Sequence, residues 1–441
     1  MSDSRDQESA PPSGADRNNG SRRARRGEAW KQLRPAHRKS SKRWCLPPVL
    51  FREPGSIAQM DGVEILDELR SDLGMLLWQI NRDVLLWAGT EPEERPRLFT
   101  AGALSRRERQ VKHAGLAGEA LAAVELLTGL LRSDVVEDAS HVTYCCERLS
   151  DWAVSARVPQ TAVWFAQAAA AASPADASVA MRVGQLTAGF GRLTLAEDWL
   201  RRAIALGRRS GDWASYGDAW VELGRVMLLR DQVARARTCF LKATRAARRH
   251  SLWATRGQAY YGLFKAAVAA DDHDDAERYA QTALSALGKQ HPDIPALLHD
   301  LAELMLRRGD NSLAAMHILQ NLLPTRRPHG ERIETLTLLV KAAGGAGEQT
   351  VLQQAWLDVL DALQRLGETP EAARYLLKLA RAAADVTEVR MAQESARRAL
   401  AIATRRVEQP LAVEAAALLE EFGVPGIAVP TPRRLRSRVM K

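Results

Sequence analysis

The sequence predicts an all-α fold, a solenoid of stacked antiparallel helix pairs, over most of its 441 residues. Three observations predict it: a small–bulky–small signature that returns about every 40 residues, a small residue at a fixed distance upstream of that signature, and a scarcity of strand patterns. Similarity at a fixed period is typical of repeat architectures, in which each unit buries its apolar face against its neighbours. Aromatic residues are 5% of the chain, against 46% for all apolar types, and we expect almost no β-structure.

The signature is a small residue, a bulky residue four positions later and a small residue three positions after that. Spacings of four and three place all three on one stripe of a helix, which we assign as the second helix of each pair. The copies are Ala162-Ala166-Ala169, Ala196-Leu200-Ala203, Ala236-Phe240-Ala243, Ala276-Ala280-Ala283, Ala314-Ile318-Asn321 and Ala392-Ala396-Ala399. The long gap before the last copy leaves room for a weaker one, which we place at Leu352-Trp356-Val359.

A second position recurs twelve residues before each signature, and it is small in five of six copies. The residues there are Ser150, Gly184, Gly224, Phe264, Ala302 and Ala380, and an apolar residue precedes each of them. This position predicts a first helix that packs closely against the second helix of the same unit. Turn formers such as Asp271-Asp272-His273-Asp274 lie between the two helices and suit helix ends and caps.

The best copy reads Trp220-x2-Leu223-Gly224-x2-Met227 and continues as Ala236-x3-Phe240-x2-Ala243. With this order of residues the chain resembles the tetratricopeptide repeat (TPR) family over roughly residues 137 to 404. The resemblance implies a right-handed α-solenoid whose first helices line a concave wall. Most units exceed the roughly 34 residues usual in the family, and the closing Pro is generally missing. Units near 40 residues are similar to those of bacterial regulators that sense peptides or partner proteins.

Composition divides the chain into four segments. We expect a disordered basic tail over residues 1–60, capping helices and a degenerate repeat over 61–135, the solenoid over 136–423, and a basic C-terminal tail over 424–441. The net charge of +9 is concentrated at the two ends, which carry +7 and +5, and the body between them is nearly neutral.

The N-terminal tail contains a cluster of arginines, Arg22, Arg23, Arg25 and Arg26. A solubilising tail is the favoured interpretation. A nucleic-acid arm, which would make the protein a transcriptional or signalling regulator, and an arm for an anionic membrane are the alternatives.

One helix is predicted to begin at Asp61-Gly62-Val63-Glu64, which resembles a capping box, and to continue through the apolar stripe that ends at Trp87. We expect this helix to cover the first repeat. A dimerising coiled coil is the alternative, which Asp83 disfavours because it interrupts the register. The segment 104–111 resembles the first helix of a helix-turn-helix domain of bacterial response regulators. The residues after it do not continue that pattern, and another helical pair is favoured.

Motifs for chemistry are missing from the sequence. It has no P-loop, dinucleotide glycine pattern, H-E-x-x-H or nucleophile elbow, and its nine His residues are scattered. The run Asp271–Asp275 lacks the alternating ligands of a calcium loop and suits a helix cap instead. We therefore expect no catalytic residue, no metal site, no cofactor and no enzymatic activity.

The cellular location is predicted from the N-terminal sequence and from the environment expected for the cysteines. No signal peptide or membrane-spanning segment is evident in the sequence. The adjacent Cys145 and Cys146 are expected to pack as small apolar side chains in a reducing compartment. We expect a soluble cytoplasmic protein.

The resemblance also suggests where a partner would bind. In the family, residues three before and one or four after the small position of each first helix face the inner wall. The candidates for partner binding are Glu147, Asp151, Met181, Val221, Arg225, Tyr261 and Lys265. Arg225 and Lys265 occupy equivalent places in consecutive units and are expected to lie close together and hold a carboxylate beside apolar surface. Glu147 and Asp151 would receive a basic residue.

This arrangement predicts a scaffold or adaptor that binds a partner peptide or protein in the groove. The alternative is that these residues form a charged, solvent-exposed face that binds no partner, which explains their pattern equally well.

Overall fold

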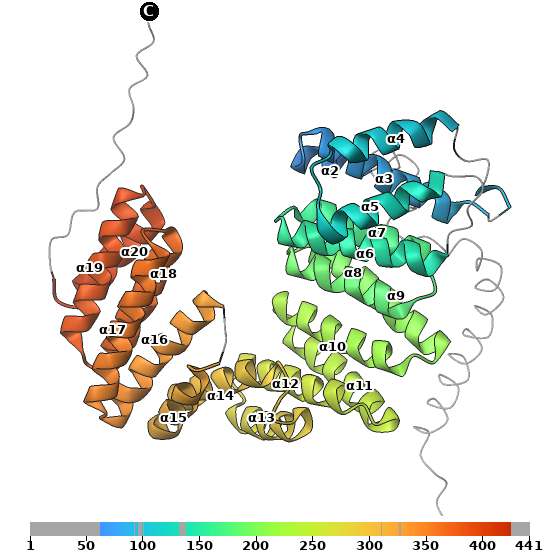
Figure 1. Cartoon of the computed structure of the whole chain (residues 1–441). Coiled ribbons are helices and arrows are strands. Elements are labelled where there is room, and N and C mark those ends of the chain that lie inside the picture. The colour runs from blue at the N-terminus through green and yellow to red at the C-terminus, as the bar shows by residue number, and fades with distance from the viewer. Residues whose placement is uncertain are drawn as a thin grey trace, which may run out of the picture. The chain divides into compact units, whose positions relative to one another are not determined.

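The computed structural model describes residues 62–424, apart from 92, 96–98, 100, 132–137, 310, 326 and 327. The predicted N-terminal tail with its arginine cluster, and the C-terminal tail beyond Val424, lie outside the described residues. Every regular element in the described part of the chain is a helix, as predicted (Figure 1). The chain divides into two compact units, one ending at Arg230 and the other beginning at Asp231.

The first unit contains nine described α-helices and one turn of 3-10 helix. They are α2 (Val63–Glu68), α3 (Asp72–Gly89), α4 (Ala101–His113), α5 (Gly118–Thr128), the 3-10 turn Gly129–Leu131, α6 (Ala139–Ser155), α7 (Pro159–Ala172), α8 (Ala177–Gly189), α9 (Leu193–Ser210) and α10 (Trp213–Leu229). Here α6 pairs with α7 and α8 with α9.

The second unit contains ten described helices. They are α11 (Val233–His250), α12 (Trp253–Ala269), α13 (His273–Leu287), α14 (Ile294–Arg308), α15 (Ser312–Leu322), α16 (His329–Ala346), α17 (Gln349–Leu366), α18 (Pro370–Asp385), α19 (Val389–Arg405) and α20 (Gln409–Glu421). The pairs are α12 with α13, α14 with α15, α16 with α17 and α18 with α19. These stacked pairs form a TPR-like α-solenoid, as the sequence predicts.

A residue with left-handed backbone ends each first helix. These residues are Arg157, Gly191, Asp231, Asp271, Gly309, Gly347 and Thr387, with φ between 57° and 75°. Such a residue lets the chain reverse direction while its neighbours' amides still cap the helix, as in the 2.9 Å bond from the Asp272 amide to the Ala267 carbonyl. The turns show the repeat period independently of the side chains.

The signature residues pack as predicted in most second helices. All three are at most 2% exposed in α7, α9, α11, α13 and α19. In α17, Leu352 and Val359 are buried and Trp356 is half-buried. Gly184 shows why a small residue recurs upstream, because a Cβ there would lie 2.6 Å from Cγ of Leu200.

The prediction for α15 is wrong by one residue. Ala314 and Ile318 are half-buried and Asn321 is exposed, whereas the buried stripe is Ala315, Leu319 and Leu322. The cause lies in the preceding turn. The second helix begins two residues after the left-handed residue in the other units, but three residues after Gly309 here, which shifts its register by one.

The prediction of one continuous N-terminal helix is also wrong, because the chain forms two helices, α2 and α3, with a break at residues 69–71. Gly74 explains the break: an added Cβ would lie 1.7 Å from the Leu69 carbonyl oxygen, so only glycine lets the chain fold back so closely. The proposed cap residue Asp61 lies outside the described residues.

Both helices pack on α7, which agrees with the predicted covering role. Because α2 and α3 cover the side of α7 that α6 and α8 leave open, α7 is buried around its circumference over Thr161–Ala172.

Asp83 interrupts the apolar stripe of α3 because it forms an ion pair with the buried Arg107 of α4. Burial raises the pKa of Asp83 above its ordinary value, and the nearby Arg107 charge only partly offsets this. The segment that resembles a helix-turn-helix opening thus uses Arg107 to hold α4 against α3. It continues, as favoured, into the pair of α4 and α5.

Two further predictions are confirmed: Cys145 and Cys146 pack as buried side chains, and the Asp271–Asp275 run caps a helix. Cys145 and Cys146 are buried thiols, and burial raises the pKa of Cys146 well above its ordinary range. Asp272 caps α13, because its side chain accepts a 3.2 Å hydrogen bond from the Asp275 amide.

Candidate binding wall on the first helices

A recurring polar contact joins neighbouring first helices. A side chain one residue after the small position of a first helix contacts a side chain two residues before the small position of the next one. These contacts, which we call rungs, are Asp151–Arg182, Gln185–Glu222 at 3.2 Å, Lys265–Asp300 at 3.3 Å and Arg381–Glu414 at 2.6 Å. Several of the predicted partner-binding residues are therefore already engaged within the chain.

The predicted acidic pair on α6 is occupied by Arg182 of α8. Arg182 forms an ion pair with Asp151, and its Nη1 lies 3.9 Å from Oε1 of Glu147. Arg148 Nη2 lies 2.7 Å from Asp151 Oδ2 as well. A basic side chain of a partner would compete with these two arginines. Arg182 was missed at the sequence level, although it directly follows the candidate Met181.

The remaining candidates of the first unit differ in exposure. Met181 is half-buried against the core. Val221 of α10 is only 1% exposed, so its side chain is buried and cannot reach a partner on the surface. The Arg225 side chain is 41% exposed, and its Nη1 donates a 2.9 Å hydrogen bond to Oε1 of Glu222. The same carboxylate oxygen accepts the bond from Gln185, so Glu222 links α8 to the cation on α10.

The second unit gathers three polar side chains around Asp300 of α14. Tyr261 Oη donates a 2.7 Å hydrogen bond to Asp300 Oδ2, and Lys265 Nζ lies 3.3 Å from the same oxygen. Lys265 Nζ also lies 4.7 Å from the centroid of the Tyr261 ring, within range of a cation–π interaction. His299 Nδ1 approaches the other oxygen of Asp300 at 3.7 Å. The structure thus brings the candidates Tyr261 and Lys265 together around a carboxylate that sequence reasoning missed.

These contacts set the charge of Asp300. Burial raises its pKa, but the polar interaction with His299, the positive charge of Lys265, and the hydrogen bonds from Tyr261 and Lys265 together outweigh burial. The net pKa of Asp300 is below its ordinary value, so this carboxylate is ionised at neutral pH.

A cavity of about 250 Å³ lies beside this cluster, between α12 and α14. Phe264, Val268, Ala269 and Leu304 give it apolar walls, while Lys265, Asp300, Glu303 and Arg307 bring two positive and two negative groups to it. Arg307 Nη2 pairs with Glu303 one turn earlier on the same helix at 2.7 Å. The cavity therefore offers an apolar recess with donors and acceptors of both charges around it.

Arg225 belongs to the first unit and Lys265 to the second. Their proximity, on which the predicted carboxylate site depends, stays a prediction.

A metal site and a membrane-spanning helix are the two other features considered for the described residues. No group of three or more His, Cys, Asp or Glu side chains there is arranged to hold a metal ion. None of the helices described is both long enough and apolar enough to cross a membrane.

Comparisons with known proteins give likenesses of fold only. No protein-family model matches the chain, and no curated protein has a significant sequence match to it. Among solved structures, the apo form of RapI is 11% identical, with a TM-score of 0.45, covering 63% of this chain and 99% of its own. A Rap conjugation regulator of plasmid pLS20, solved with the Phr* peptide, is 12% identical, with a TM-score of 0.42 and coverage of 79% and 98%. PilF of Pseudomonas aeruginosa is 14% identical, with a TM-score of 0.41 and coverage of 52% and 94%. By its own helix pairs, turns and signature, the chain is a TPR-like repeat protein.

Proposed function

We propose that the protein is a scaffold or adaptor that binds a peptide or a segment of a partner protein on its first helices, centred on α12 and α14. The cavity between these helices carries the proposal, because it combines an apolar recess with charged groups of both signs. Ligand sites in proteins are mostly apolar with a few placed polar groups, and this cavity has that composition.

A peptide suits this chemistry better than a small ion does. An apolar side chain would enter between Phe264, Val268 and Leu304, while backbone amides would donate to Asp300 or Glu303. A carboxylate of the peptide would meet Lys265 and Arg307. Lys265 is half exposed, so its ammonium can reach a ligand while it remains near Asp300. In the first unit, Glu147, Asp151, Met181 and Arg225 are proposed to contact a partner on that unit's own first helices.

The test is capture of a partner by the full-length protein, followed by titration with that partner once purified. Lys265→Glu combined with Arg307→Glu reverses the two cations of the cavity, and we expect binding to weaken at least about tenfold. Lys265→Glu also places a negative charge next to the half-buried Asp300, so a lower melting temperature is expected for this variant, and binding is compared at a temperature at which it is fully folded.

The matched control is Lys289→Glu combined with Arg397→Glu, which makes the same total charge change at two exposed positions of the same unit that do not line this cavity. Equal binding by the cavity variant and the control would remove α12 and α14 from the proposed site.

A further inference from the structure

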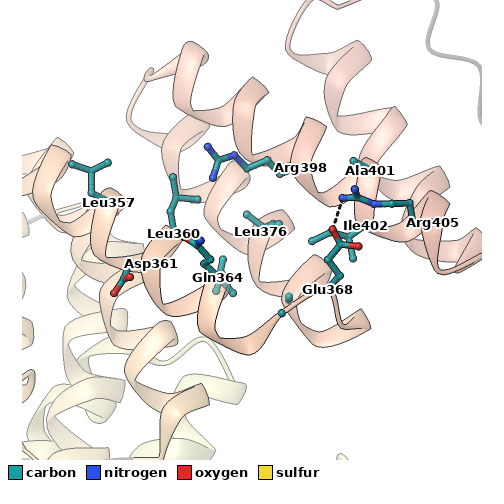
Figure 2. Close-up of a pocket in the computed structure, with 13 residues that line it drawn as sticks. Leu357, Leu360, Asp361, Gln364, Glu368, Leu376, Arg398, Ala401, Ile402 and Arg405 are labelled. Carbon is teal, nitrogen blue, oxygen red and sulfur yellow. Dashed lines mark ion pairs between the residues drawn. The ribbon is translucent and has the colours of Figure 1, made fainter.

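A second cavity lies on the second helices, between α17 and α19, with α18 behind it (Figure 2). Its volume is about 520 Å³. None of its lining residues was among the predicted site residues, which lie on first helices. Binding here would be independent of the function proposed above.

The lining residues follow two helical stripes. On α17 they include Leu357, Leu360 and Gln364, and on α19 they include Arg398, Ile402 and Arg405. Both sets recur every three or four residues, so one face of each helix borders the cavity. The stripe on α19 runs from Arg398 to Arg405, eight residues that extend over about 10 Å of helix. The cavity is therefore a groove two helical turns long, which we call the α17/α19 groove.

The interior of this groove is aliphatic. Leu360, Leu376 and Ile402 line it one after another from α17 across α18 to α19, and Leu357 at one end is 53% exposed (Figure 2). A leucine more than half exposed next to an open aliphatic recess leaves apolar surface in water, and covering it with apolar groups is favourable.

The charges along the groove are separated by side. Its α19 border carries Arg398 and Arg405, whereas Asp361 and Glu368 stand on the opposite border. Arg405 is held by Glu368 across one end of the groove at 2.8 Å. Arg398 pairs with Glu394 one turn earlier on α19, and its side chain is 50% exposed. Such an exposed pair within one helix is weak, so Arg398 can exchange Glu394 for a carboxylate of a ligand.

We propose that the α17/α19 groove binds an amphipathic α-helix of a partner protein. Its aliphatic side chains, spaced i, i+4 and i+7, would pack on Leu360, Leu376 and Ile402, and a carboxylate on its flank would pair with Arg398. The spacing follows from the length of the groove, and the acidic flank follows from the basic α19 border. This is the helix-in-groove mode of peptide recognition.

The test uses a fluorescein-labelled helical peptide of about three turns, with Leu at i, i+4 and i+7 and Glu along one flank. A peptide of the same composition with scattered Leu positions is the reference. We expect the full-length protein to bind the patterned peptide at least about tenfold more tightly than the reference by fluorescence anisotropy. Arg398→Glu should remove most of that difference, and a peptide with Lys in place of Glu should restore binding to this variant.

Arg397→Glu is the matched control, because Arg397 is the exposed neighbour of Arg398 on α19 and does not line the groove. It should bind like the natural protein, whereas Leu357→Asp should weaken binding. Lys265→Glu should leave binding unchanged, which separates this site from the α12 and α14 cavity.

The proposal is overturned if the protein shows no preference for the patterned peptide, or if the Arg397 and Arg398 variants lose affinity for it equally. It is also overturned if decanoate displaces the patterned peptide at a similar concentration, because the groove would then be assigned to a small aliphatic acid.

Discussion

Glu68 of α2 caps the N-terminus of α7, although it is more than ninety residues away in sequence. Its carboxylate accepts hydrogen bonds from the Gln160 amide at 2.7 Å, the Thr161 amide at 2.8 Å and the Thr161 hydroxyl at 2.9 Å. Val158, at the cap position of α7, provides no side-chain cap, and Pro159 has no N–H to donate. Replacing Glu68 should therefore loosen α2 and the start of α7 together.

The magnitude follows from these three bonds. Loss of a helix cap costs about 1–2 kcal/mol, and a carboxylate at a partly buried helix N-terminus contributes up to about 2 kcal/mol more. Glu68→Ala removes both contributions and leaves two amides unpaired, so the expected loss is about 2–4 kcal/mol of unfolding free energy. Glu68→Gln keeps one acceptor oxygen but loses the charge, and about 1–2 kcal/mol is expected.

Urea denaturation combined with hydrogen exchange of the α7 segment measures this effect, because a repeat array can open one part at a time. Exchange in residues 159–172 should accelerate in step with the loss of stability. Asp67→Asn is the control, since Asp67 is exposed beside Glu68, and a change under about 0.5 kcal/mol is expected. If Glu68→Ala behaves like this control, the capping argument is refuted.

Three further predictions concern packing, backbone and charge. Gly184→Ala should destabilise the first unit by about 1–3 kcal/mol in thermal melts, because the new methyl group would meet the Leu200 side chain. The control is Gly189→Ala, which should be neutral or slightly stabilising in the same melts, because a Cβ at position 189 would have nothing within 4 Å. Val407 has a left-handed φ of 62°, which is strained for a β-branched residue. Val407→Gly should therefore raise the unfolding free energy of the second unit by about 0.5–1 kcal/mol, seen as a higher urea midpoint. Asp300 has a lowered pKa in the folded state, so its contribution is present above the unfolded pKa of about 4 and is lost as the pH falls through the folded value. Asp300→Asn should flatten the acid-side loss of stability of the second unit, and an unchanged pH profile would contradict the assigned contacts.

The repeat pattern was predictable because it depends on local spacing. Buried stripes at Ala196, Leu200 and Ala203, and the turn around Asp271 and Asp272, arise from residues close together in sequence. The shift of one residue in α15 was not predictable, because an extra turn residue changes register without changing the apolar composition. Periodicity also cannot reveal the break after Glu68, since apolar residues continue across it in helical spacing.

The candidate site was only partly predictable for a different reason. Spacing along a helix identifies which face Lys265 occupies, but it does not identify its partner on the next helix. In the sequence, nothing distinguishes Asp300 and Arg182 from other charged residues. The stacking of neighbouring helix pairs brings Asp300 against Lys265 and Arg182 against Asp151. The α17/α19 groove depends on how much of its lining stays exposed, which composition does not determine.

The rungs have a consequence for the order in which the repeats can follow one another. Asp151 precedes Arg182, an acid followed by a base, whereas Lys265 precedes Asp300, a base followed by an acid. Placing α8 directly after α12 would set Lys265 against Arg182 and produce repulsion. An exchange of whole units between positions would therefore meet electrostatic mismatches even where the apolar stripes agree, so the modules of this chain are alike in shape but not interchangeable.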